Sequence, residues 1–189
     1  MIQEIKELVE ETCKKETNYF GYRAWKEHIL PVVKFSKILA GKLNADKEIV
    51  EVAALLHDYS SVLNKDLYLE HHIHSAKLAE DILKKYSYSE ERVERVKQCI
   101  ISHRASKNIP KETVEAQIIA DADSLAHFDN IGSMLYLAFV IHKMDSEKGT
   151  KWVLDKLERD WNRLTLSESK KIIEEKYKSI KVALEISGP

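Results

Sequence analysis

Apolar residues recur with the period of an α-helix along almost the whole chain. In the first segment, residues 2–16, one face carries Ile5, Leu8, Val9 and Thr12. No segment of useful length alternates with the two-residue period of a strand. The same spacing predicts further helices at residues 19–39, 46–58, 71–85, 90–103, 110–123, 130–143, 147–162 and 167–184. An all-α fold is therefore expected.

Glycine and proline, which interrupt helices, are scarce, with five Gly and three Pro in the chain. Pro31 lies inside the second predicted helix. Because its ring nitrogen carries no hydrogen, it should bend or break that helix one turn after His28. Gly41 is expected to end the helix, and Asn44 or Asp46 is placed to cap the next one.

Two stretches depart from the amphipathic pattern. Residues 59–70 are polar, and we expect a turn-prone connection there. Residues 130–143 are nearly all apolar, which predicts a central, buried helix with Tyr136 and Phe139 in the core. Pro110, between two apolar stripes, is expected to open the helix that follows it.

Length and composition favour one soluble domain. The 189 residues are enough to bury a core, and we expect a single domain over residues 1–189. Thirty Lys and Arg against 31 Asp and Glu predict no stable nucleic-acid partner. Cys13 and Cys99 form no CxxC motif, which argues against a disulfide framework or a thiolate metal site. Because the N-terminus is unlike a signal peptide and no apolar run could span a bilayer, we expect a cytoplasmic protein without a membrane partner.

Candidate chemistry centres on His57 and Asp58, which follow the apolar run 52–56. His28 and Asp123 lie in apolar helical patterns of their own. Helical bundles build metal sites from inward side chains on facing helices. Imidazole and carboxylate ligands suit a divalent cation that keeps open positions for water and substrate. These four residues are therefore candidate ligands of one metal ion.

The order of these residues, with further histidines between them, resembles the HD-domain superfamily of metal-dependent phosphohydrolases. The resemblance covers about residues 20–140 and is carried by Ala-Ala-Leu-Leu-His-Asp at 53–58 and Ala-Asp-Ala-Asp-Ser-Leu at 120–125. It implies an all-α HD-domain helical bundle with a metal site in its core, held by the four residues named above. It also implies an HD core at about residues 20–145, with amphipathic C-terminal helices at about 147–184.

Members of this superfamily with two metals add two histidines, and Asp58 would then bridge the ions. A pattern of the type His-x-x-x-Ser-Ala favours His71 as the first added ligand, although a shift of one turn would select His74, and His72 stays a further alternative. The second added ligand usually ends an Ile-rich helix, which matches His103. The resemblance thus implies a divalent metal, Mn, Mg, Co, Ni or Fe, as one ion with room for a second.

Phosphoester cleavage at such a site needs further side chains. A metal polarises a phosphoryl oxygen and lowers the pKa of its water, while a bridging Asp58 would orient the nucleophile. Lys65, Arg104 and Lys107 lie nearest in sequence to the predicted mouth and are candidates for binding the substrate phosphate, with Lys65 also a candidate for catalysis. Asp66 is a candidate general acid or base for the leaving oxygen.

We therefore expect a phosphomonoesterase or phosphodiesterase that acts on a small phosphorylated molecule, with a nucleotide as the favoured substrate. The chain lacks the Gly-Tyr-Pro element of cyclic-dinucleotide phosphodiesterases and the Glu-Asp pair of guanosine-tetraphosphate hydrolases. Two alternatives stay open: an HD-type di-iron oxygenase, and a non-catalytic metal-bearing helical module that docks a partner through residues 147–184. A homodimer is also permitted. His127, one turn after Asp123, is expected to support a ligand or to pack.

Overall fold

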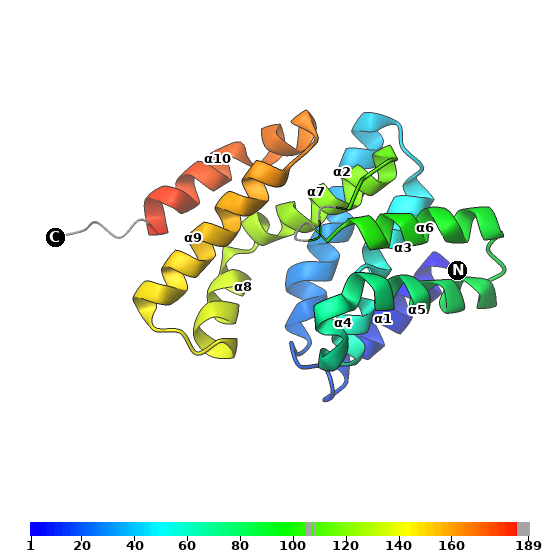
Figure 1. The fold of residues 1–189 in the computed structure, drawn as a ribbon, viewed down its shortest axis with the longest axis horizontal. Helices are drawn as coiled ribbons and strands as arrows, with labels where there is room; N and C mark the ends of the chain where they lie inside the picture. The colour runs from blue at the N-terminus through cyan, green and yellow to red at the C-terminus, as the bar shows by residue number, and fades with distance from the viewer. Residues whose placement is uncertain (105–106, 108, 185–189) are drawn as a thin grey trace.

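The computed structural model describes residues 1–104, 107 and 109–184. This part of the chain is helical and contains no strand, so the predicted all-α fold is confirmed (Figure 1). The elements are α1 (Ile2–Lys14), η1 (Trp25–Ile29), α2 (Leu30–Leu43), α3 (Lys47–Leu56), α4 (Tyr59–Leu63), η2 (Lys65–Glu70), α5 (His71–Lys85), α6 (Glu90–Ser102), α7 (Val114–Asp129), α8 (Ile131–Tyr136), η4 (Leu137–Ile141), α9 (Ser146–Arg163) and α10 (Ser167–Leu184). Segments η1 and η4 are π-helical turns, and η2 is a 3-10 helix.

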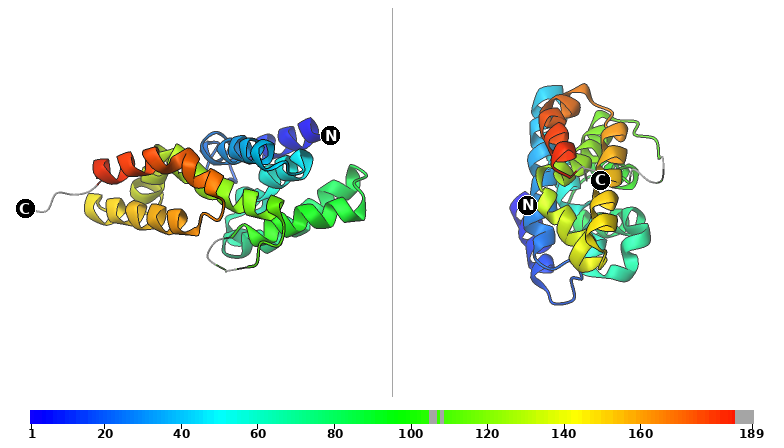
Figure 2. Two further views of the ribbon diagram at one scale, coloured as in Figure 1. Left: turned by 90° about the horizontal axis from the view of Figure 1, so that it is seen from above. Right: turned by 90° about the vertical axis from the view of Figure 1, so that its left-hand side faces the viewer.

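The helices are arranged along one long axis. Helices α9 and α10 lie together at the end where the C-terminus leaves, and α5 pairs with α6 at the other end (Figure 1). Between these two pairs, α2 packs against both α3 and α7. The view from above shows the same order (Figure 2, left). The centre of the molecule is therefore built by α2, α3 and α7.

Helix α3 is buried over most of its surface because α1, α2, α6 and α7 pack around it. Its buried residues are Ile49, Val50, Val52, Ala53, Ala54, Leu55 and Leu56. From Val52 onward the helix is apolar all round, which is typical of a core helix. It starts under the predicted Asp46 cap, whose Oδ1 accepts the N–H groups of Glu48 and Ile49, both at 3.1 Å. Its C-cap is His57, which therefore lies inside the protein.

The second predicted helix continues through Pro31, which corrects the expected break. The π turn of η1 directly precedes α2, and the N–H of Leu30 bonds to the carbonyl of Trp25, five residues earlier. The π turn shifts the hydrogen bonds from four to five residues apart just before Pro31, which has no N–H to donate, and the helix continues. The helix also passes through Gly41 and ends at Asn44, whose φ of 53° is a left-handed conformation that asparagine tolerates.

Residues 59–70 are not an open connection, because they form α4 and η2. The buried residues of α4 are Tyr59, Ser60, Ser61 and Val62. The polar sequence suggested exposure, but a serine can be buried when its hydroxyl forms hydrogen bonds inside the protein, as that of Ser60 does. Ser60 Oγ donates to the carbonyl of His71 at 3.2 Å and accepts from Ser75 Oγ at 2.9 Å.

The apolar stretch 130–143 is not the central helix either, since it forms α8 and the π turn η4. Phe139 is 36% exposed and Val140 is 51% exposed. Tyr136 lines a pocket and is not part of the core. The central position belongs to α7, whose buried residues run along most of its length. Apolar content alone did not separate a core helix from a segment at the edge of the core.

Helix α7 begins beyond Pro110, which therefore does not open it. Thr113 is its N-cap, and Thr113 Oγ1 accepts the N–H of Ala116 at 3.1 Å. Among the described residues, no single helix is long and apolar enough to cross a membrane. Helix α7 and the segment Ile131–Ile141 meet that test only as a pair, and the pair is bent by 79°.

Helices α9 and α10 extend the core from the C-terminal end by packing on α7. Their core residues are Val153, Leu157, Ile173, Tyr177 and Ile180. Asp121 of α7 accepts the backbone N–H of Thr165 at 3.0 Å and that of Leu166 at 2.9 Å. The turn between α9 and α10 is thereby tied to the centre of the molecule.

Candidate metal centre

Four of the predicted ligands converge at the middle of the molecule. His28 comes from η1, His57 and Asp58 from the junction of α3 and α4, and Asp123 from α7. The Nε2 of His28 lies 3.1 Å from the Nε2 of His57. The same atom is 3.3 Å from Oδ2 of Asp58 and 3.3 Å from Oδ1 of Asp123. The structure thus brings together the four residues whose sequence order suggested one metal site.

A second group lies on the other side of Asp58. His71, at the start of α5, has its Nε2 3.2 Å from the Nε2 of His103, which follows α6. It is also 3.3 Å from Oδ1 of Asp58. Of the three neighbouring histidines that sequence left open, His71 is the one in this group, whereas the ring of His72 faces Glu70, with Nε2 3.8 Å from Oε2.

The ends of helices fix the orientation of three of these rings. The last carbonyls of a helix have no partner within it. The Nδ1 of His57 donates to the carbonyl of Ala54 at 2.8 Å, and that of His103 donates to the carbonyl of Ile100. The Nδ1 of His71 donates to a carbonyl of η2 in the same way, at 2.8 Å. Each ring therefore presents its Nε2 lone pair to the cluster, as metal-binding histidines do.

Asp58 connects the two groups. Its Oδ2 faces His28, and also lies 3.7 Å from Nε2 of His57, while its Oδ1 faces His71. Within the described part of the chain, Oδ1 is buried and has no hydrogen-bond partner. A buried carboxylate oxygen needs a partner, and a cation between Asp58 and the histidines would be one. Nitrogen and oxygen donors in this arrangement fit a divalent metal ion.

Burial and neighbouring charge set the protonation of the cluster. Burial alone would raise the pKa of Asp58 and of Asp123, but the surrounding histidines hold both pKa values below the usual range. Burial lowers the pKa of His103 to about 4 and also lowers that of His57. For His28, burial opposes protonation, yet contact with the two carboxylates raises its pKa. These shifts favour ionised carboxylates and the neutral forms of His57 and His103, which are the forms that bind metals.

The predicted catalytic residues of η2 do not reach this cluster. Lys65 and Asp66 are exposed, and neither lines the pocket beside the metal ligands. The Nζ of Lys65 lies over the ring of Tyr19, 4.9 Å from its centroid. The expectation rested on closeness in sequence to Asp58, but α4 intervenes and η2 turns these two side chains outward.

The two predicted phosphate-binding residues after His103 are also engaged elsewhere. The Nη1 of Arg104 donates to the carbonyl of Leu69. The Nζ of Lys107 pairs with Oε1 of Glu70 at 3.1 Å. Neither cation lines the pocket beside the cluster. The structure therefore places both side chains against η2, next to the second histidine group and outside that pocket.

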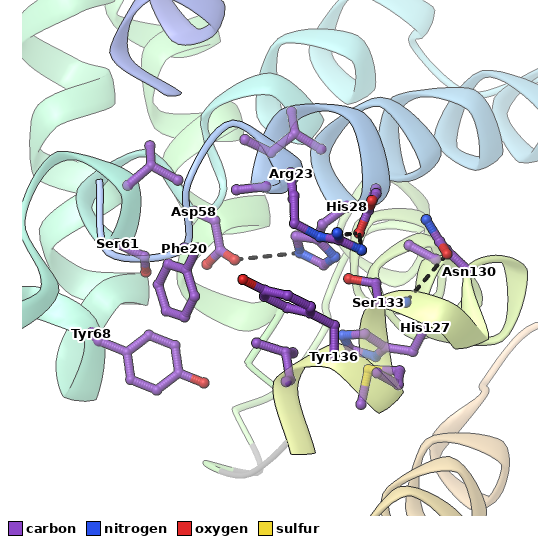
Figure 3. A pocket seen from close by; sticks show the side chains of 17 residues that line it. Phe20, Arg23, His28, Asp58, Ser61, Tyr68, His127, Asn130, Ser133 and Tyr136 are labelled. Carbon is purple, nitrogen blue, oxygen red and sulfur yellow. Dashed lines mark hydrogen bonds and ion pairs between the residues drawn. The ribbon is translucent and has the colours of Figure 1, made fainter. Parts of the chain in front are cut away.

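A pocket opens beside the first group and encloses about 800 Å³, including space open to solvent (Figure 3). Its lining residues are Phe20, Arg23, Ala24, Glu27, His28, Ile29, Asp58, Ser61, Val62, Tyr68, Ala126, His127, Asn130, Ser133, Met134, Tyr136 and Leu137. Rings from three separate segments, Phe20, Tyr68 and Tyr136, contribute to this wall. Such a mixture of aromatic and polar lining is typical of small-molecule sites.

The sequence did not point to Arg23. Among the described residues, it is the only Arg or Lys whose side chain lines this pocket. Its guanidinium carbon is 4.1 Å from the ring centroid of Tyr136, and its Nη2 is 2.9 Å from Oε2 of Glu27. The one signal in the sequence is that Arg23 precedes His28 on the same helical segment. Tyr136 gave no such signal because its stretch is nearly all apolar and was expected in the core.

Comparison with known proteins gives a family and a fold. The sequence profile of the HD domain matches residues 25–127, more than half of the chain. An uncharacterized protein of Clostridium beijerinckii is 34% identical over 102 residues. That match covers 53% of this chain and 62% of the relative, so the chain spans less than two thirds of the length of that protein.

Three solved structures share the fold. Bacillus subtilis YpgQ in complex with ADP has a TM-score of 0.71 and 20% identity, covering 100% of this chain and 99% of that one. Lin1889 from Listeria innocua has a TM-score of 0.70 and 22% identity, with 98% and 94% covered. A predicted HD superfamily hydrolase from an uncultured Thermotogales bacterium has a TM-score of 0.58 and 20% identity, with 92% and 91% covered.

Proposed function

Because this chain belongs to the HD-domain family, we propose that it is a metal-dependent phosphohydrolase acting on a small phosphorylated molecule. The observation that carries the proposal is the position of Asp58. Its Oδ2 is 3.3 Å from His28 and its Oδ1 is 3.3 Å from His71, so one carboxylate serves both histidine groups. Two-metal sites of this kind stabilise both the attacking and the leaving oxygen of an in-line displacement.

The chain's own residues divide the work as follows. One ion would be held by His28, His57, Asp58 and Asp123, and a second by Asp58 with His71 and His103. A bound divalent ion would polarise a phosphoryl oxygen of the substrate and lower the pKa of a bound water. Because the Nδ1 atoms of His57, His71 and His103 are tied to backbone carbonyls, these rings need not rotate to act as ligands. That preorganisation keeps the geometry of the reacting groups constant.

The pocket supports a nucleotide as the substrate. Arg23 offers a guanidinium to a phosphate group, for which its planar set of donors is well suited. The rings of Phe20, Tyr68 and Tyr136 offer faces on which a base can stack. The fold is shared with YpgQ, whose structure contains ADP. A phosphomonoester and a phosphodiester of a nucleoside are both compatible with this pocket.

The proposal is tested by metal-stimulated hydrolysis of a panel of nucleoside mono-, di- and triphosphates, cyclic and dinucleotide diesters, and sugar phosphates. The products are separated by chromatography, because cleavage of a diester leaves a monoester and releases no free phosphate. We expect the wild-type protein to hydrolyse at least one nucleotide when Mn²⁺, Mg²⁺, Co²⁺ or Ni²⁺ is added. D58A should lose this activity, because it removes the carboxylate shared by both groups. H142Q is the control, since His142 is exposed and meets Trp152 edge to face outside the pocket.

Metal content measured on the same samples separates the alternatives. Equal activity of D58A and wild type on every phosphoester contradicts the proposal. Two bound irons with dioxygen consumption and no hydrolysis would assign the centre to oxygenase chemistry instead. Bound metal without either activity would favour a metal-bearing binding module.

A further inference from the structure

A third group of potential ligands lies next to the first and includes a histidine without a role so far. The Nε2 of His127 is 4.0 Å from Oδ1 of Asp123. Its ring stacks on that of His28, with centroids 5.4 Å apart and an interplanar angle of 12°. The ligand atoms of these three residues lie within 4.8 Å of one another. His127 also lines the pocket, as does Tyr136 (Figure 3).

A buried carboxylate from α9 holds this ring in place. Oδ2 of Asp160 lies 2.9 Å from Nδ1 of His127, and Asp160 is only 2% exposed. The Nζ of Lys156 is 3.1 and 2.9 Å from the two oxygens of Asp160. The carboxylate therefore has a cationic partner on its own helix and still accepts from His127. A buried charge needs such pairing to be tolerated.

The contact with Asp160 decides which nitrogen of His127 carries the proton. A carboxylate can only accept a hydrogen bond, so the proton lies on Nδ1 of His127. Lys156 is 3.3 Å from the same nitrogen, but its hydrogens have closer acceptors in the oxygens of Asp160. In the neutral imidazole this leaves a lone pair on Nε2, which faces the carboxylate of Asp123. Two electron-rich atoms that face each other in this way are stabilised by a cation between them.

We propose that His127 is a further ligand of the ion held by His28 and Asp123, and that Asp160 is its positioning residue. The inference rests on the proposed metal centre and adds a ligand to it. Metal-binding histidines donate their other ring N–H to a carboxylate or a carbonyl. His127 shares that feature with His57, His71 and His103. The C-terminal helices would thus support the metal site as well as the core.

The test is titration of metal-free protein with Mn²⁺ by calorimetry, together with the visible absorption of the Co²⁺-loaded protein. H127Q should weaken binding of the ion held by His28 and Asp123 and change the Co²⁺ spectrum, because a nitrogen ligand is lost. D160N should weaken binding by about 10–100-fold, which is typical for a residue that orients a ligand. In the double variant, D160N should add nothing to the effect of H127Q, because Asp160 acts through His127. H142Q serves as the control for loss of a histidine.

Each outcome has a defined meaning. H127Q that binds Mn²⁺ as tightly as wild type, with an unchanged Co²⁺ spectrum, overturns the inference and leaves the proposed function intact. Additive effects of H127Q and D160N overturn the role of Asp160, because they indicate separate actions. If circular dichroism shows that H127Q does not fold, the inference is tested with D160N alone. An Mn²⁺ affinity and a Co²⁺ spectrum unchanged in D160N would then count against the inference. Wild-type protein that binds no metal overturns the proposed function and this inference together.

Discussion

His57 and His103 each follow the last turn of a helix, and each donates its Nδ1–H to a carbonyl of that turn. The same hydrogen bond therefore caps the helix and selects the tautomer that exposes Nε2. Asp58 follows His57 but has a different task, because its two oxygens face different groups. Neighbours in the chain thus act as a terminal ligand and as a connecting one.

Asp46 uses its two carboxylate oxygens for different purposes, which variants can separate. Oδ1 caps α3, and Oδ2 pairs with Arg92 at 3.4 Å and Arg95 at 3.2 Å. Asparagine keeps the cap and loses the charge, so D46N should destabilise the fold by roughly 0.2–1 kcal/mol per ion pair. D46A should cost about 1 kcal/mol more because the cap is lost as well. Urea denaturation at pH 7 measures both.

The effect of D46N should depend on pH. Burial by itself would raise the pKa of Asp46, but the N–H of Ile49 and the charges of Arg92 and Arg95 lower it. Because the pKa is lower in the folded state, the charged form stabilises the protein above the unfolded value of about 3.9, and this stabilisation is lost as the pH falls through the folded value. The stability difference between the wild type and D46N should therefore begin to shrink below about pH 4 and vanish once the pH is below the folded-state pKa. A difference that persists there would contradict the assignment.

At the scale of elements, α7 serves two purposes with two aspartates. Asp123 contributes to the ligand cluster, whereas Asp121 accepts hydrogen bonds from Thr165 and Leu166. Burial raises the pKa of Asp121 even though these hydrogen bonds oppose the shift. Two residues along a helix correspond to about 200° of rotation, so the pair faces opposite sides. Helix α7 thus connects the metal centre with the start of α10.

Replacement of Asp121 should therefore affect stability and leave metal binding alone. D121A leaves the N–H of Leu166 buried without its acceptor, which should lower the free energy of unfolding by about 1–3 kcal/mol. D121N keeps one acceptor oxygen and should cost less. Urea denaturation measures the loss, and Mn²⁺ titration should show wild-type affinity for D121A. A D121A protein as stable as wild type would show that this contact does not anchor α10.

For the whole molecule, one apolar cluster runs from α1 to α10. It includes Trp25 of η1, in the central part of the molecule, and Leu157 of α9, in its C-terminal part. Because small proteins with a continuous core unfold cooperatively, we expect the HD core and the C-terminal helices to unfold as one domain. The C-terminal pair also covers the side of α7 that carries Asp121.

This expectation can be tested with tryptophan as a local probe. In a W152F/W161F background, fluorescence reports on Trp25 alone. L157A on α9, where Leu157 is fully buried, should destabilise by about 2–5 kcal/mol. It should lower the urea midpoint of Trp25 fluorescence as much as that of circular dichroism. V182A is the control, because Val182 is 75% exposed and should change stability by less than about 0.5 kcal/mol. An unchanged Trp25 midpoint in L157A would indicate two domains.

The sequence by itself determined the helical class, most of the helices, and the residues that meet at the first ligand group. It could do so because helical periodicity is local and because His57 and Asp58 directly follow a fully apolar run. Their approach to His28 and Asp123 followed from the order of the motif.

Only the tertiary structure decided which of three adjacent histidines faces Asp58, and that Lys65 and Asp66 lie outside the pocket while Arg23 lines it. It also brought Asp160 of α9 against His127, 33 residues away in the chain. Such pairings depend on how helix ends and helix faces meet after packing. Local periodicity specifies a face of each helix but not its partner, which explains why these contacts were not apparent in the sequence.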